Sequence, residues 1–92
     1  MLRQQLPHYV PVQALSWIDT GASLVLYDRS RGSYHALNSS ASAIWRQLGD
    51  HGTEMEIVDA LAARFSVDRD AVVADVSAFL SSALSAGLIE VP

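Results

Sequence analysis

The sequence contains no cysteine and no lysine. Without cysteine, the chain has no disulfide, no catalytic thiolate and no cysteine-ligated zinc. Its six positive residues are all arginines, none of them follows Arg69, and ten acidic residues give a net charge of −4. Because a nucleic-acid binder usually gathers lysine and arginine on one face, this charge balance disfavours nucleic-acid partners.

Long hydrophobic runs are also missing. No window approaches the roughly 20 apolar residues that span a bilayer, and the N-terminal segment lacks the apolar stretch of a signal peptide. We therefore expect a soluble, cytoplasmic protein with no membrane partner. Half of the 92 residues are apolar, which suits one compact domain. We expect residues 1–9 to be a flexible lead-in and residues 10–92 to form a single domain.

Three segments in the first half of the chain are typical of β-strands. Residues 10–18 are rich in β-formers, residues 24–28 form a dense apolar run, and residues 33–37 follow the turn at Gly32. Their short connections predict an antiparallel meander. Such a sheet leaves one strand with unpaired backbone groups, and nothing later in the sequence clearly predicts a strand that covers them. This unpaired edge is a candidate site of function.

Three helices are predicted after the strands. The first begins behind Asn38, Ser39 and Ser40, which are all good N-cap types, and ends near residues 49–52. The second begins with a capping box at residues 53–56. Asp68 can cap the third helix, and Gly87 can end it in a left-handed conformation. Three strands followed by three helices make an α+β fold, and the short connection between the last two helices, beside a hairpin, gives the outline of a winged helix.

Apolar residues at helical spacing predict the core. Trp17 and Trp45 are expected to be core anchors. On the second helix the expected apolar stripe is Ile57, Val58, Leu61 and Phe65, and on the third helix the expected broad face is Val72, Val73, Val76, Phe79, Leu80, Ala83 and Leu84.

Catalytic signatures are missing from the sequence. The three histidines, His8, His35 and His51, lie on different predicted elements, and no metal-ligand spacing, glycine-rich phosphate loop or Gly-x-Ser-x-Gly elbow occurs. We therefore expect a protein that is not an enzyme and that needs no metal or cofactor.

Two stretches, LVLYDRSRGSYHALNSSASAIW and GTEMEIVDALAARFSVDRDAVVADVSAFLSSALSAGLIEV, resemble the PqqD-like family, whose members recognise leader peptides in the making of ribosomally synthesised, modified peptides. The resemblance runs from about Leu24 to Val91. The residues that carry it are Leu37-Asn38, Ile44-Trp45, Asp75-Val76 and Gly87-Leu88-Ile89. One departure is Ala41, where some members have glycine after the hydroxyl residue of the helix cap.

The resemblance implies a winged-helix-like domain that binds the leader of a precursor peptide as an added antiparallel strand. Within the family, the sequence is most similar to the free-standing version found in lasso-peptide pathways, which works with a leader protease and a macrocyclase. A partner of a radical-SAM maturase is the other family role. The implied peptide-binding strand is Ser33, Tyr34, His35, Ala36 and Leu37, and the implied facing helix supplies Val72, Val73, Asp75, Val76 and Phe79.

Alternation along the implied strand assigns its side chains to two faces. We expect Leu37 on the core face, with His35 facing inward or at the margin of the groove, and Tyr34 and Ala36 on the opposite face. Asp75 borders the apolar stripe of the third helix, where it could meet a donor or a positive side chain of the guest. Ordinary core packing is the competing interpretation for the apolar helix residues, and a solvated helix flank is the competing interpretation for Asp75.

The sequence leaves two other functions open. A winged-helix DNA-binding regulator would use the third helix as its recognition helix, but that helix offers only Arg69 among several aspartates. A structural adaptor would dimerise through the free strand edge.

Overall fold

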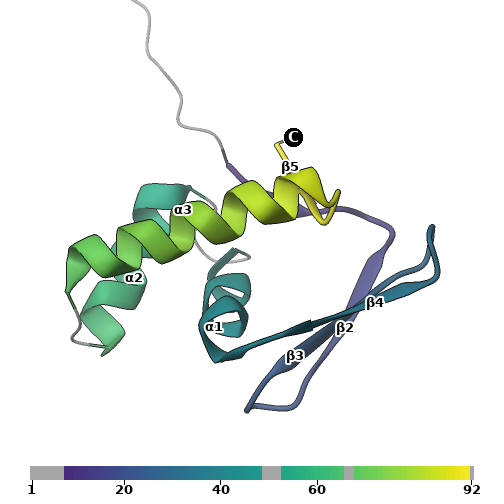
Figure 1. The fold of residues 1–92 in the computed structure, drawn as a ribbon, viewed down its shortest axis with the longest axis horizontal. Helices are drawn as coiled ribbons and strands as arrows, with labels where there is room; N and C mark the ends of the chain where they lie inside the picture. The colour runs from purple at the N-terminus through teal and green to yellow at the C-terminus, as the bar shows by residue number, and fades with distance from the viewer. Residues whose placement is uncertain (1–7, 49–52, 66–67, 92) are drawn as a thin grey trace, which may run out of the picture.

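The computed structural model describes residues 8–48, 53–65 and 68–91, which form a three-stranded antiparallel sheet followed by three helices (Figure 1). The predicted α+β fold is therefore confirmed. The elements are β1 (Val10–Pro11), β2 (Leu15–Asp19), β3 (Leu24–Asp28), β4 (Ser33–Leu37), α1 (Ser39–Leu48), α2 (Glu54–Phe65), α3 (Arg69–Ser85) and β5 (Ile89–Glu90).

The three-stranded sheet has the order β2-β3-β4, with β3 in the centre. In the register, Leu26 of β3 lies between Trp17 of β2 and His35 of β4. Alternation along β3 buries Leu24 and Leu26 almost completely, because their side chains face the helices. Among the described residues β4 pairs only with β3, so its outer edge is unpaired, as the short meander predicted.

The prediction of one strand over residues 10–18 is wrong. The chain turns after β1, where the Leu15 N–H donates to the Val12 carbonyl over 3.1 Å, and β2 begins at Leu15. β1 pairs instead with β5, and Pro11 lies opposite Ile89 in this two-stranded sheet. β5 therefore covers β1 and leaves the edge of β4 open.

Most of the predicted lead-in, residues 1–7, lies outside the described residues. His8 forms an isolated antiparallel bridge with Thr53, and Tyr9 packs, partly buried, against the core.

Side-chain caps fix the starts of the first two helices. Asn38 Oδ1 accepts a hydrogen bond from the Ala41 N–H over 2.8 Å, so Asn38 is the N-cap of α1. Thr53 Oγ1 accepts from the Glu56 N–H over 3.2 Å and donates to Glu56 Oε1 over 2.8 Å. The end of the first predicted helix, at residues 49–52, lies outside the described residues.

The third helix begins and ends as predicted. Asp68 caps its start by accepting from a backbone N–H of the first turn. At its end Gly87 has φ 75°, and its N–H donates to the Leu84 carbonyl while the Leu88 N–H donates to the Ala83 carbonyl. This pair of bonds is the Schellman motif, which needs a left-handed residue and so favours glycine. None of the helices in the described ranges is long and apolar enough to cross a membrane.

The core lies between the sheet and the helices, and Trp45 is buried in it as expected. The expectation for Trp17 is wrong, because 45% of this residue is exposed. β2 is an edge strand, and Trp17 packs there in a T-shaped contact with Trp45, 5.4 Å away between ring centroids. The predicted apolar faces also include three residues that the structure leaves 37–48% exposed, namely Phe65, Val73 and Leu84.

A fully buried serine joins α1 to the sheet. Ser42 Oγ accepts from the Leu24 N–H over 3.1 Å and donates to the Leu37 carbonyl over 3.3 Å. Because both backbone groups are buried, these two bonds satisfy polar atoms that water does not reach. They fix the start of α1 relative to the end of β4.

Candidate functional site

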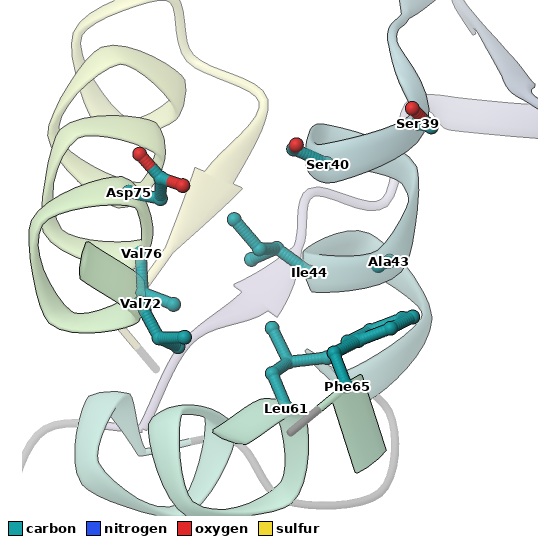
Figure 2. Close-up of a pocket in the computed structure, with 9 residues that line it drawn as sticks. All are labelled: Ser39, Ser40, Ala43, Ile44, Leu61, Phe65, Val72, Asp75 and Val76. Carbon is teal, nitrogen blue, oxygen red and sulfur yellow. The ribbon is translucent and has the colours of Figure 1, made fainter. Parts of the chain in front are cut away.

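Two adjoining cavities lie against α1 and α3. The first has a volume of about 200 Å³ and is lined by Ser39, Ser40, Ala43, Ile44, Leu61, Phe65, Val72, Asp75 and Val76 (Figure 2). The second has a volume of about 360 Å³ and is lined by Asn38, Ser40, Ala41, Ile44, Asp75, Ala78, Phe79 and Ser82. Because Ser40, Ile44 and Asp75 line both cavities, the two form one continuous depression, which we call the α1–α3 groove.

The groove has an apolar floor and a polar rim. Ile44 and Val76, which line its floor, are almost completely buried. Figure 2 shows the Asp75 carboxylate on α3 and the Ser40 hydroxyl on α1 on opposite sides of the first cavity, with Ile44 and Val72 deeper inside. Asp75 is the one charged side chain that lines either cavity within the described ranges. The groove is therefore suited to apolar side chains, with one acceptor for a donor or a positive group.

Helical spacing brings the α3 residues to the groove. Positions 72, 75, 76, 79 and 82 follow one another at intervals of one or three residues, so they share a face of the helix. On the opposite wall the N-cap turn at Asn38 places Ser40 immediately after the end of β4. The groove thus begins where the free strand edge ends.

β4 and α3 run in opposite directions (Figure 1). The end of β4 leads into Asn38, which lines the second cavity together with Phe79 and Ser82 in the second half of α3. Before the start of β4, Arg31 in the turn donates from Nη1 to the Ala86 carbonyl at the end of α3 over 2.7 Å. The unpaired edge of β4 and the groove face of α3 therefore flank the same side of the molecule.

The predicted helix residues are mostly brought together by the structure. Val72, Asp75 and Val76 line the first cavity, and Asp75 and Phe79 line the second. The Phe79 ring packs on Trp45 with 6.5 Å between ring centroids. Val73 lines neither cavity and is 37% exposed.

The predicted strand residues form the free edge of β4, and none of them lines either cavity. Leu37 lies on the buried face, as expected, and His35 is half-buried with its Nε2 atom 3.5 Å from Ser33 Oγ. Tyr34 and Ala36 are exposed on the other face, where the Tyr34 ring lies 4.7 Å from the Tyr27 ring.

Sequence reasoning did not assign a site role to the first turns of α1 or to the end of α2. Asn38 and Ser40 were predicted only as candidate caps, Ile44 only as part of the resemblance, and Phe65 only as part of an apolar stripe. All four line the groove. A signal was present in Phe65, because a large apolar residue at the last position of a helix has little core left to cover.

The described part of the chain contains no candidate metal site. No three His, Asp or Glu side chains there come close enough together to hold a metal ion.

The model of the family "Coenzyme PQQ synthesis protein D (PqqD)" matches residues 23–89, which is most of the chain. The chain belongs to the PqqD family. The matched range contains β3, β4, all three helices and the start of β5, so it includes both walls of the groove and the free edge. A comparison with curated proteins found no match.

Two solved structures have the same fold as this PqqD-family chain. TbiB1 in complex with the TbiA(beta) leader peptide is 32% identical, with a TM-score of 0.80 over 87% of this chain and 93% of that chain. Lasso peptide synthetase B1 complexed with the leader peptide is 24% identical, with a TM-score of 0.79 over 90% of this chain and 98% of that chain. At this lower identity the second likeness supports the fold alone.

Proposed function

We propose that this PqqD-family chain binds the leader segment of a ribosomal precursor peptide as an added antiparallel strand on the edge of β4. The observation that carries the proposal is that the unpaired edge of β4 adjoins the α1–α3 groove. An extended peptide on a sheet edge gains backbone hydrogen bonds that are largely independent of its sequence, while its alternate side chains enter pockets that select them. This chain has both a free strand edge and side-chain pockets in one place.

The groove suggests which side chains the leader presents. The first cavity is closed at its base by Leu61, Ile44 and Val76, so it suits one large apolar side chain. One step along the groove, Asp75 and Ser82 line the second cavity, which suits a side chain that donates hydrogen bonds or carries positive charge. The solved structure of TbiB1, 32% identical and in complex with a leader peptide, supports the same class of guest.

The proposed role in the cell is delivery without chemistry. The chain would hold the leader and present the precursor to a leader protease and a macrocyclase, in the cytoplasm, in the making of a lasso peptide. The choice of this pathway follows the resemblance of the sequence to the free-standing version found in lasso-peptide pathways. A pathway with a radical-SAM maturase is the alternative, and the genes beside this one distinguish the two.

Hydrogen exchange tests the added strand directly. The probes are the TbiA(beta) leader peptide and leaders of short precursor genes next to the gene for this chain. We expect a bound leader to slow exchange of alternate backbone amides within β4, because those N–H groups face the guest strand. β2 is the matched control, since it is the other edge of the same sheet. Protection at β2 rather than β4 would contradict the proposal.

A blocked groove tests the side-chain part. Ala78 is exposed on α3 and lines the second cavity, whereas its neighbour Ser77 is exposed and lines neither. Ala78→Trp would fill the groove, so we expect leader affinity, measured by fluorescence polarisation, to fall at least about tenfold from the loss of one buried side-chain contact. Ser77→Trp should bind as the wild type does. Equal affinity of both variants would place the guest elsewhere.

A further inference from the structure

A single arginine ties the β3–β4 turn to the end of α3. Arg31 Nη1 donates to the Ala86 carbonyl over 2.7 Å, and Arg31 Nε lies 3.9 Å from Oδ2 of the buried Asp28 carboxylate. Asp28 is itself held by the Ser30 N–H and hydroxyl. In the described part of the chain no other hydrogen bond joins the turn or β4 to α3 or its C-cap. Arg31 therefore makes the polar connection between these two parts.

The connection lies at one end of the proposed peptide site. Ser82 lines the second cavity, and Ala86 follows it by one helical turn, a rise of about 6 Å. Arg31 precedes β4 by two positions. The hydrogen bond thus spans from the strand side of the site to the helix side, just beyond the groove.

The end of α3 is shaped to receive this arginine. The last carbonyls of a helix carry partial negative charge, which attracts a guanidinium. Gly87 contributes by having no side chain, because a Cβ atom there would lie 3.2 Å from Arg31 Nη2. The same glycine is required for the left-handed end of the helix, so one residue serves both the helix end and the arginine contact.

We infer that Arg31 is a positioning residue for peptide binding, which holds β4 at a fixed distance from α3. This inference rests on the proposed function. An inserted strand must reach the β4 backbone and the α3 pockets at the same time, so a preset distance lowers the ordering cost of binding. The Arg31 side chain is 63% exposed, and exposed polar contacts contribute little to folding stability. A loss of binding without a loss of stability is therefore the expected signature.

Binding kinetics provide the first test. Arg31→Ala is compared with Arg29→Ala, because Arg29 lies in the same turn but donates to the Gln13 carbonyl over 2.8 Å, away from α3. Because the preset distance is lost and the ordering cost of binding rises, we expect Arg31→Ala to weaken binding of labelled leader about fivefold, mainly through faster dissociation. Arg29→Ala should bind as the wild type does, and Arg31→Lys should recover part of the loss. Unfolding midpoints should change little in all three.

Distance measurement provides the second test, and its comparison of the wild type with Arg31→Ala needs no leader. The sequence has no cysteine, so spin labels attach only at introduced sites, here Tyr34→Cys on β4 and Ser81→Cys on α3, both exposed. We expect a narrow distance distribution that broadens when Arg31→Ala is added and narrows again when leader is bound.

The two tests separate this inference from the proposed function. Wild-type affinity in Arg31→Ala, an equal loss in Arg29→Ala, or an unchanged distance distribution in Arg31→Ala would overturn the positioning role. If the wild type binds no leader at all, the proposed function fails, and the distance distributions still decide whether Arg31 holds β4 against α3.

Discussion

Two aspartates at strand ends carry the clearest electrostatic signals among the described residues. Asp19 accepts two hydrogen bonds of 2.8 Å from Arg46 and one from the Gly21 N–H, which lower the pKa of its carboxyl to about 2. Asp28 accepts from the Ser30 hydroxyl over 2.6 Å and from the Ser30 N–H, and these bonds hold the pKa of its carboxyl below the usual range. Folding therefore favours the ionised form of both carboxyls.

Stability should therefore depend on pH in the acid range. A carboxyl whose pKa is lowered in the folded state contributes stability above its unfolded pKa of about 3.9, and this contribution is lost as the pH falls through the folded value. We expect the wild type to lose stability between about pH 4 and pH 2. Asp19→Asn should be less stable than the wild type at pH 7, and the gap should shrink at about pH 2. Urea unfolding at several pH values measures this, and a gap that does not depend on pH would contradict it.

At the scale of single residues, the sequence predicted the roles of those residues whose structural neighbours are also close in the sequence. An N-cap among Asn38, Ser39 and Ser40, and Leu37 on the core face, follow from neighbours within a few positions. The expectation for Trp17 failed because its burial depends on whether β2 is a central or an edge strand, which hydrophobicity does not encode. The site role of Ser40 was missed for a similar reason, since it depends on α3, far along the chain.

At the scale of elements, the end of α3 is the most informative. Gly87 and Gly32 both have positive φ, of 75° and 65°. A Cβ atom at Gly32 would meet nothing within 4 Å, whereas one at Gly87 would press on the Arg31 guanidinium. The two glycines therefore differ in surroundings and share the same backbone requirement.

Alanine at each glycine separates these effects. We expect Gly32→Ala to cost about 1–2 kcal/mol from left-handed backbone strain alone. Gly87→Ala should cost about as much in denaturant unfolding, because it imposes the same backbone strain, and its Cβ atom would in addition press on the Arg31 guanidinium. Only Gly87→Ala should in addition weaken leader binding. If the two variants bound leader equally well, the contact between Gly87 and Arg31 would have no role in the site.

Helices were easier to predict than the short strands. Each helix start depends on a capping residue beside an apolar period, and all of that lies within one stretch of sequence. β1 and β5 are two residues long and pair across nearly the whole chain. Strands of two residues are too short to show an alternating pattern or a clear β-propensity. The break within residues 10–18 was therefore missed.

At the scale of the whole molecule, the sequence predicted the two components of the site separately. The short meander predicted an open strand edge, and the family resemblance indicated α3. The groove itself depends on how α1 and the end of α2 pack against α3, as Ile44 and Phe65 show. This packing joins parts of the chain whose spacing in sequence carries no periodic signal.

The arrangement of charges on the whole molecule argues against the DNA-binding alternative. Arg69 stands at the start of α3, where its Nη1 atom lies 2.6 Å from Asp59 Oδ1. Asp70 and Asp75 are exposed on the same helix. A recognition helix needs positive groups that displace counterions from phosphates, and this helix instead presents carboxylates.

We therefore expect no mobility shift of duplex DNA, even at about 50 mM salt, where electrostatic binding is strongest. The same preparation should bind labelled leader, which shows that the protein is folded. A useful comparison is Asp70→Lys combined with Asp75→Lys, which changes the charge of α3 without altering its caps. Weak, salt-sensitive DNA binding by this variant alone would show that the missing property is charge rather than shape. A salt-sensitive shift by the wild type would contradict the expectation and favour a DNA-binding role, because the net charge of −4 opposes any non-specific contact with phosphates.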